Sequence, residues 1–470
     1  MKWALYNLLF AAVYPFLLPG FLLRMLRRGG YAARMGDRFA LYPDEIMPRI
    51  ASPASNSRRA EWVWIHAVSV GEVQVAGQLM REWRKTEPDV RFCFSTTSST
   101  GWKMAERELG VGVDGRCRAD GDVLIYNPLD FPNFVKSALK TVRPRAIVLT
   151  ESEIWPNFIL QAKKMGIPLF LINARVSDRS APRYKAAKWF FGEVLSSFTR
   201  IFAQSDLDKA RLVAAGAPEA KVEVTGSFKF DVARRNEAKE RELREWIFGD
   251  ASDASESRMA RILLGGSTWP GEDEVLLGIY KRLIEQSNNQ NNRTILVIAP
   301  RHFEKADAIE ANIRKYGFAC VRRSREAKSK DEVEQWKEKF HCSPSAKDFD
   351  YPPVYLADTT GELMGLYGIA DVVFVGKSLC AHGSQNMIEP CLCGKPTLVG
   401  PYTENFRPVM SDLLASDAIV QVKDAKELEE GIVGCLEGLR FGGLGERAKA
   451  AVEKRLGVVA KCVSEIRGAL

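Results

Sequence analysis

The sequence has little of what marks several common protein classes. Its basic residues are not gathered into a nucleic-acid motif, and it has no aromatic-plus-basic ribonucleoprotein pattern, which argues against a nucleic acid as partner. Its nine cysteines are irregularly placed, and the one close pair, Cys391 and Cys393, lacks the spacing of a usual zinc or redox site. No internal repeat or low-complexity tract stands out. The cysteines therefore predict a protein body with reduced, mostly buried thiols.

What the chain does have is length, apolar residues and a moderate positive charge. Its 470 residues are enough for two domains, and 46% hydrophobic with 27% charged residues is typical of a folded protein. The net charge of +8 suits either an anionic partner or simply a solvated basic surface.

The first 28 residues form a distinct segment. The run from Trp3 to Leu23 carries no charge and is just long enough to cross a bilayer, although two prolines and a glycine interrupt it. A helix lying flat in the membrane interface, or one buried in the protein, is the alternative. Arg24, Arg27 and Arg28 follow, and positive charge prefers the cytoplasmic side of a membrane. We therefore expect a membrane anchor with the protein body on the cytoplasmic side.

Beyond residue 60, short apolar runs alternate with longer amphipathic ones. Runs such as Ala146–Thr150 and Thr294–Ala299 are nearly continuous in apolar residues, as strands of a parallel sheet covered on both faces are. This predicts an α/β protein with two doubly wound, Rossmann-like domains and a cleft between them. The expected parts are the anchor at 1–28, a first domain at 29–236, a linker at 237–258 and a second domain at 259–470, whose last helix is able to pack back on the first.

Charged side chains follow several strand ends in the first half of the chain. Glu72 comes just after the first strand, Glu151 and Glu153 after the fourth, Asn173–Arg175 closes the fifth, and Lys229 follows the last. The carboxyl ends of parallel strands share one edge, where ligands of such sheets bind. An acid in the first turn of a helix also complements the helix dipole, so Glu72 by itself has a purely structural explanation. The recurrence of charged side chains at successive strand ends favours a functional site at this edge.

The second half carries the features of a nucleotide site. A glycine turn, Gly265–Thr268, precedes a helix, although it is not the dinucleotide fingerprint. Arg301 ends the next strand and offers a cation to a phosphate there. Thr360–Glu362 and Ser384–Pro390 each open a further helix. Helix N-termini together with an arginine predict a nucleotide site that needs neither a metal nor another cofactor.

One motif indicates instead a nucleotide site that does need a metal. Asp120-Gly121-Asp122 matches the Asp-x-Asp pattern with which metal-dependent glycosyltransferases hold a nucleotide diphosphate. Because it stands among glycine and arginine just before a strand, we favour a plain turn.

The ordered set of motifs resembles the family of 3-deoxy-D-manno-octulosonic acid (Kdo) transferases. The motifs are His66–Glu72, Thr150–Asn157, Asn173–Ser177, Thr225–Asp231, Pro300–His302, Thr360–Leu363 and Asn386–Glu389. The resemblance runs from the anchor almost to the C-terminus. It implies the GT-B fold, in which two Rossmann-like domains face each other across a cleft, and association with the inner membrane. It also implies transfer of Kdo from CMP-Kdo to the lipid A precursor, without a metal.

The resemblance implies roles for individual residues as well. It makes Glu72 the general base and places Glu151 and Lys229 where the family stabilises the transition state. It places CMP at Pro300, Arg301, Thr360, Gly361, Glu362, Asn386, Met387, Ile388 and Glu389. The chain departs from the family at Gln385–Glu389, where His-Asn-Pro-Leu-Glu or its isoleucine form is common. One base without a second nucleophilic carboxylate fits an inverting displacement.

Two other functions stay open at this point. One is a different GT-B transferase, or an epimerase, that uses a UDP-sugar. The other is a catalytically inactive, membrane-bound binder of a nucleotide or lipid. A donor profile separates the first from a Kdo transferase, and a turnover assay separates the second.

Overall fold

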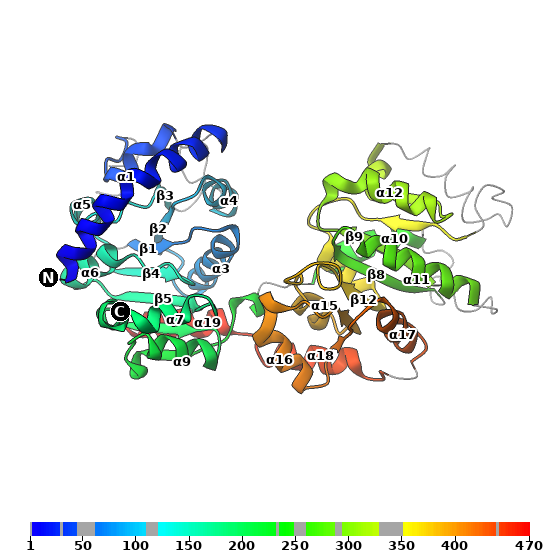
Figure 1. The fold of residues 1–470 in the computed structure, drawn as a ribbon. Coiled ribbons are helices and arrows are strands. Elements are labelled where there is room, and N and C mark those ends of the chain that lie inside the picture. The colour runs from blue at the N-terminus through cyan, green and yellow to red at the C-terminus, as the bar shows by residue number, and fades with distance from the viewer. Residues whose placement is uncertain are drawn as a thin grey trace. The chain divides into compact units, whose positions relative to one another are not determined.

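The computed structural model describes residues 2–28, 32–44, 62–109, 121–231, 235–248, 260–286, 294–328, 351–438 and 441–470 (Figure 1). The chain forms two compact units, the first made of Met1–Val232 with Gly457–Leu470 and the second of Ala233–Leu456. Each unit is an α/β domain built on one seven-stranded sheet.

The sheet of the first unit has the order β3-β2-β1-β4-β5-β6-β7, and all neighbouring strands are parallel. Its strands are β1 (Trp62–His66), β2 (Arg91–Thr96), β3 (Val123–Tyr126), β4 (Ala146–Thr150), β5 (Leu169–Ala174), β6 (Arg200–Ala203) and β7 (Val222–Val224). The chain order runs outward from β1 on one side and from β4 on the other. The topological switch point, where such sheets bind ligands, therefore lies between β1 and β4.

Helices cover both faces of this sheet, so that strand residues alternate between two cores. Trp64 packs into one core and its neighbours Val63 and Ile65 into the other. The helices are α3 (Val70–Thr86), α4 (Ser99–Leu109), α5 (Pro132–Val142), α6 (Pro156–Lys164), α7 (Ala181–Ala186), α8 (Lys188–Ser196) and α9 (Asp206–Ala214). The C-terminal helix α19 (Val458–Gly468) also lies in this unit and packs against α3.

The sheet of the second unit has the order β10-β11-β9-β8-β12-β13-β14 and is parallel as well. Its strands are β8 (Arg261–Thr268), β9 (Thr294–Pro300), β10 (Cys320–Arg322), β11 (Val354–Leu356), β12 (Val372–Val375), β13 (Thr397–Val399) and β14 (Val420–Gln421). Its helices are α10 (Glu237–Phe248), α11 (Glu272–Gln286), α12 (Ala306–Lys315), α14 (Leu363–Ile369), α15 (Ile388–Leu392), α16 (Arg407–Ala415), α17 (Ala425–Leu436) and α18 (Leu444–Glu453). The switch point of this sheet lies between β8 and β12.

The boundary between the units differs from the one expected from the sequence. Helix α10 occupies the start of the expected linker, 237–258, and packs on α14 within the second unit. Leu243, Trp246 and Ile247 are buried along one side of it, an apolar stripe that its many charged residues obscure in the sequence. The second unit ends at Leu456, because α19 completes the core of the first.

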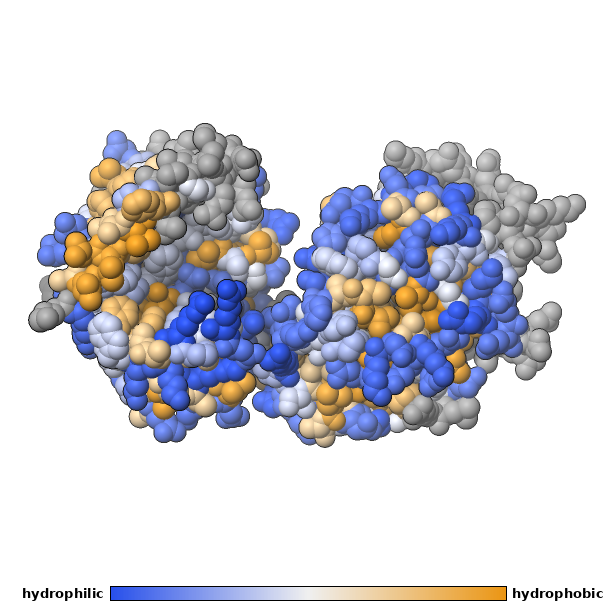
Figure 2. Space-filling view, in the orientation of Figure 1, coloured by the Kyte–Doolittle hydropathy of each residue, from blue (hydrophilic) through white to orange (hydrophobic). Residues whose placement is uncertain are grey.

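Helix α1 (Lys2–Arg28) is docked on the first unit through its N-terminal half. Trp3 Nε1 donates to Glu193 Oε1 at 2.9 Å, and the Tyr6 hydroxyl donates to Asp130 Oδ2 at 2.9 Å. The opposite face of α1 is apolar and exposed at Leu5, Leu8, Leu9, Val13 and Phe16 (Figure 2). Among the described residues, no helix combines the length and hydropathy that crossing a membrane requires.

Candidate active site

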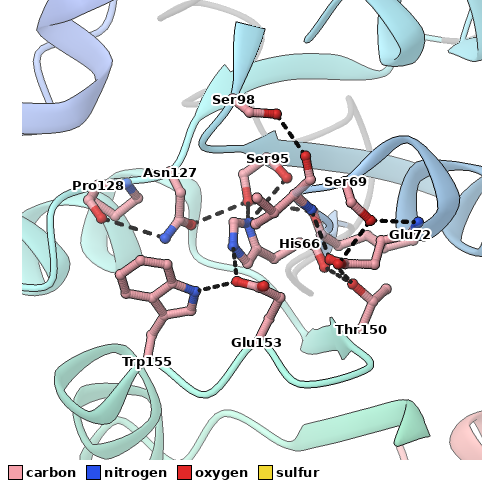
Figure 3. A network of polar contacts seen from close by, with 12 residues as sticks. His66, Ser69, Glu72, Ser95, Ser98, Asn127, Pro128, Thr150, Glu153 and Trp155 are labelled. Atoms are coloured by element: carbon pink, nitrogen blue, oxygen red, sulfur yellow. Dashed lines mark hydrogen bonds and ion pairs between the residues drawn. The ribbon is translucent and has the colours of Figure 1, made fainter. Parts of the chain in front are cut away.

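Glu72 lies in the first turn of α3, just beyond β1 and beside the switch point (Figure 3). Ser69 caps this helix, since its Oγ accepts from the Glu72 backbone N–H at 3.3 Å and donates to Glu72 Oε1 at 2.9 Å. The other carboxylate oxygen, Oε2, accepts from the Val68 N–H at 2.9 Å and lies 3.1 Å from Thr150 Oγ1. This is close to a capping box, so part of the role of Glu72 is structural.

The carboxylate of Glu72 retains room for one more donor. An ionised carboxylate offers about four lone-pair positions. Val68 and Ser69 donate to two of them. Thr150 Oγ1, whose single proton is also shared with the His66 carbonyl at 3.0 Å, lies at a third. Glu72 is only 7% exposed, so little water competes for the remaining position. A carboxylate held in this way is able to take a proton from a bound hydroxyl group.

Glu151 follows β4, the strand next to β1, and its backbone is left-handed with φ +49°. Strain of this kind in a residue other than glycine is concentrated at functional sites. Asn173, at φ +51°, donates from Nδ2 to Glu151 Oε1 at 3.1 Å, and its Oδ1 accepts from the Phe228 N–H at 3.1 Å. Asn173 thereby links the ends of β4 and β5 to the 3₁₀ helix Phe228–Asp231, which carries Lys229.

The charges of Glu72, Glu151 and Lys229 influence one another's surroundings, as the pKa shifts of Glu151 and Lys229 show. Burial raises the pKa of Glu151, the Glu72 carboxylate raises it further, and Lys229 and Arg175 oppose the rise. Burial lowers the pKa of Lys229, with Glu151 acting against the shift and Arg175 adding to it. The structure therefore gathers Glu72, Glu151 and Lys229, the three catalytic residues predicted from the sequence, into one charged cluster.

Glu153, the second acid after β4, belongs to a polar network with His66, Ser95 and Trp155 (Figure 3). Its Oε2 accepts from Trp155 Nε1 at 2.9 Å and faces His66 Nε2 at 3.6 Å. His66 is fully buried, and its Nδ1 lies 2.9 Å from Ser95 Oγ. The network holds the ends of β1, β2 and β4 together, which gives Glu153 a supporting task.

Replacing Lys229 with methionine should move the acidic limb of the pH–activity profile to higher pH. Lys229 lowers the pKa of Glu151, so its removal raises that pKa and keeps Glu151 protonated up to a higher pH. Lys229→Arg retains the charge and should leave the limb close to that of the parent. The measurement is kcat/KM against pH, and a limb that stays in place or moves to lower pH would contradict the coupling.

In the second unit, Pro300 is the last residue of β9 and Arg301 follows it. The Arg301 N–H donates to the Thr268 carbonyl at 3.0 Å, which fixes the end of β9 against that of β8. The Arg301 side chain is exposed. A guanidinium at this edge suits the phosphate-binding role that the resemblance implies.

Thr360, Gly361 and Glu362 form the turn between β11 and α14. Gly361 adopts φ +84°, a conformation that glycine tolerates without strain. The Glu362 carboxylate is already paired with Arg323 Nη2 at 3.1 Å and Lys239 Nζ at 3.2 Å. Burial acts to raise the pKa of Glu362, but the Arg323 guanidinium keeps it below its usual range. The Glu362 side chain therefore has a structural task in holding this turn.

The turn Asn386–Glu389 follows β12 and opens the short helix α15. Asn386 Oδ1 accepts from the Ile388 N–H at 3.1 Å, and its Nδ2 donates to Glu389 Oε1 at 2.9 Å. Met387 and Ile388 are fully buried, so they shape the turn. Burial raises the pKa of Glu389, and Asn386 opposes the rise. The CMP residues expected from the sequence thus follow β9, β11 and β12, at the carboxyl edge of one sheet.

The described part of the Asp-x-Asp motif, Gly121 and Asp122, has a structural explanation. Asp120 lies outside the described residues, whereas Asp122 is buried, accepts from the Phe92 N–H at 2.8 Å and pairs with Arg84. It stands before β3, at the amino edge of the sheet. Among the described residues, no group of three or more histidine, cysteine or acidic side chains is arranged to hold a metal.

Thr150 and Asn173 contact the candidate catalytic carboxylates, although neither was predicted from the sequence to have a role of its own. Both are fully buried polar residues at or next to the end of an apolar strand. Buried polar side chains are uncommon in such strands, so a polar residue at the end of an apolar run was a signal in the sequence that could have indicated a site residue.

A family model and a curated relative place the sequence in one family. Residues 33–232 match a family model described as 3-deoxy-D-manno-octulosonic-acid transferase (kdotransferase). The 3-deoxy-D-manno-octulosonic acid transferase of Bordetella pertussis is 32% identical over 398 residues, 84% of this chain and 84% of that protein. A bifunctional glycosyltransferase/methyltransferase of Fusobacterium nucleatum is 28% identical over 82% of this chain, which spans 54% of that longer protein. A glycosyltransferase structure from Rickettsia africae matches 87% of this chain and 98% of its own, with a TM-score of 0.52 at 12% identity, a likeness of fold alone.

Proposed function

The chain belongs to the Kdo transferase family of glycosyltransferases and has its GT-B fold, and on that premise we propose that it transfers Kdo from CMP-Kdo to the lipid A precursor, lipid IVA. Membership makes it a glycosyltransferase of lipopolysaccharide biosynthesis. The acceptor, the course of the reaction and the residues that perform it are what we propose.

The observation that carries the proposal is the charged cluster at the first switch point. Glu72 has an open acceptor position, and Glu151 and Lys229 lie close enough to perturb each other's pKa. A purely structural cap would not need a second acid with a strained backbone, Glu151, and a half-buried lysine, Lys229, close to it. Buried carboxylates and a lysine with opposed pKa shifts are a common feature of acid–base sites.

The proposed reaction is a single displacement. The acceptor hydroxyl passes its proton to the Glu72 carboxylate while its oxygen bonds to the anomeric carbon of Kdo. The bond from that carbon to the CMP oxygen breaks on the opposite side, so the anomeric configuration inverts. CMP leaves as an anion that needs positive charge and N–H donors rather than an acid, which suits Arg301 and the turns beyond β11 and β12.

A donor profile tests this proposal against the use of a UDP-sugar. The protein is incubated with a lipid A precursor and with CMP-Kdo, UDP-glucose or UDP-N-acetylglucosamine in turn, and release of the free nucleotide is measured. We expect release from CMP-Kdo alone and only when the acceptor is present. Release from a UDP-sugar, or none from any donor, would contradict the proposal.

We also propose that α1 attaches the protein to the cytoplasmic surface of the inner membrane, where an acylated acceptor lies. Its exposed apolar face is the feature that supports this, because such a face is costly to leave in water. Tyr6 reaches the buried Asp130 from the other face, so deleting α1 would also disturb the domain. Substitutions on the exposed face are therefore a sharper test than truncation.

Replacing Leu8 and Leu9 with glutamate should release the protein from membranes and leave catalysis intact. Full burial of one leucine is worth roughly 1.5–3 kcal/mol, so two substitutions should lower partitioning by at least about tenfold. Sedimentation with anionic liposomes measures this. Transfer to acceptor dispersed in detergent should stay within about twofold of the parent. Undiminished sedimentation would place the attachment elsewhere in the protein.

A further inference from the structure

The side chains of Trp269 and Lys377 meet at the switch point of the second sheet. Trp269 follows β8 and Lys377 follows β12, the neighbouring strand. The Lys377 ammonium lies over the Trp269 ring, 4.7 Å from its centre. Doubly wound sheets bind their ligands at the switch point, just beyond the carboxyl ends of the strands between which the strand order reverses.

A buried carboxylate fixes the backbones that carry these side chains. Glu272 is fully buried, and its Oε2 accepts from the Trp269 N–H and from the Lys377 N–H, both at 2.8 Å. Its Oε1 accepts from the N–H groups of Ser378 at 3.1 Å and Leu379 at 3.0 Å. One carboxylate thus ties the ends of β8 and β12 together, and its hydrogen-bonding capacity is spent on the backbone rather than on the ammonium.

Lys377 is held in a conformation that a lysine adopts only at a cost. Its φ is +55°, in the left-handed region that glycine occupies freely. Gly376 before it permits a close approach of the two strand ends, because a Cβ at that position would collide with the Ser267 carbonyl oxygen. Within the part of the chain that the structure describes, Lys377 Nζ has no carboxylate partner. A strained, positioned cation without an ion pair points to an anionic ligand.

A second contact connects this pair to the expected nucleotide site. The Trp269 ring meets the ring of His302 edge to face, with centroids 4.6 Å apart. His302 follows Arg301, the cation already assigned to phosphate, at the end of β9. Lys377 and Arg301 therefore stand on the two sides of the end of β8, with Trp269 between them.

We infer that Lys377, positioned by Trp269 and Glu272, binds an anionic group of the nucleotide sugar. This inference rests on the proposed function, since CMP-Kdo carries two such groups, the phosphate and the carboxylate of the sugar. The phosphate and the carboxylate both present anionic oxygens to an ammonium. CMP contains only the phosphate and CMP-Kdo contains both groups, so comparing the two ligands shows which group Lys377 binds.

The test compares Lys377→Gln with the parent in the full-length protein. Calorimetry gives the affinities for CMP and for cytidine, and initial rates give KM and kcat with CMP-Kdo. If Lys377 binds the phosphate, the CMP affinity falls about tenfold and the cytidine affinity is unchanged. If it binds the sugar carboxylate, the CMP affinity is unchanged and KM for CMP-Kdo rises about tenfold. Either loss should shrink at high salt, because charges at an open edge are screened.

Matched variants separate binding from folding. Lys377→Gly removes the charge and relieves the left-handed backbone, so it should lose ligand affinity without losing thermal stability. Lys377→Arg should keep most of the affinity. Lys315→Gln removes the same charge from the end of α12, away from the carboxyl edge, and should behave as the parent.

The inference is overturned if Lys377→Gln and Lys377→Gly keep the CMP affinity and the KM for CMP-Kdo within about twofold of the parent. A parent protein that neither binds CMP nor consumes CMP-Kdo would instead refute the proposed function on which the inference rests. The two failures are therefore distinguishable in the same set of measurements.

Discussion

Replacing Glu72 with glutamine should lower turnover by about 10²–10⁴-fold while the affinity for CMP stays near that of the parent. Glutamine has the same shape and its amide oxygen still accepts from the Val68 N–H, so the cap at α3 is largely kept. What is lost is the ability to take a proton from the acceptor hydroxyl. The measurements are kcat with CMP-Kdo and acceptor, and calorimetry with CMP.

The first unit offers a matched control for the structural part of this change. Asp208 occupies the same place in α9 that Glu72 has in α3, with Ser205 Oγ accepting from its N–H at 3.2 Å and its Oδ1 accepting from the Val176 N–H at 2.9 Å. Asp208→Asn therefore converts a buried capping acid to its amide away from the switch point. It should cost a similar amount of stability, about 1 kcal/mol, with turnover near that of the parent. Equal turnover losses in both variants would show that Glu72 acts only as a cap.

Replacing Arg301 with alanine should weaken CMP binding by about 1.5–3 kcal/mol, or roughly 10- to 150-fold in Kd. Its side chain is exposed at the carboxyl edge of the sheet, where a phosphate would accept a charge-assisted hydrogen bond from it. Because CMP is the leaving group, kcat with CMP-Kdo should also fall. Calorimetry with CMP measures the main effect.

Arg261 supplies the control for this variant. It begins β8, so it lies at the amino edge of the same sheet. Arg261→Ala removes the same charge from the same domain and should leave CMP affinity within about twofold of the parent. If Arg301→Ala binds CMP as the parent does, the phosphate lies elsewhere.

The strands could be predicted from the sequence because burial on both faces leaves an unmistakable apolar run. Ala146–Thr150 was expected with the same bounds that β4 has, and Thr294–Ala299 is one residue shorter than β9. Strand β10 was missed, since it is a three-residue strand at the edge of its sheet and ends in arginine. Some helix was expected in the linker at 237–258, but the many charges of α10 obscured the buried stripe by which it packs into the second unit.

The candidate site was partly predictable for a related reason. Strand ends meet at one edge in a parallel sheet, so Glu72, Glu151 and Lys229 could be grouped before their contacts were known. Which partner each side chain has could not be predicted. The pairing of Glu362 with Arg323 joins residues 39 positions apart in sequence, and neither sequence neighbourhood indicates it. The contact of Lys377 with Trp269 likewise arises only when β12 lies beside β8.

The most direct test of the account is a mass spectrum of the lipid A precursor after incubation with CMP-Kdo, taken in parallel for the parent and for Glu72→Gln. We expect the parent to add the mass of at least one Kdo residue to the acceptor, and the variant to leave nearly all of the acceptor unchanged over the same time. An acceptor left unmodified by the parent would contradict the proposed transfer. Equal modification by both proteins would contradict the assignment of Glu72 as the base.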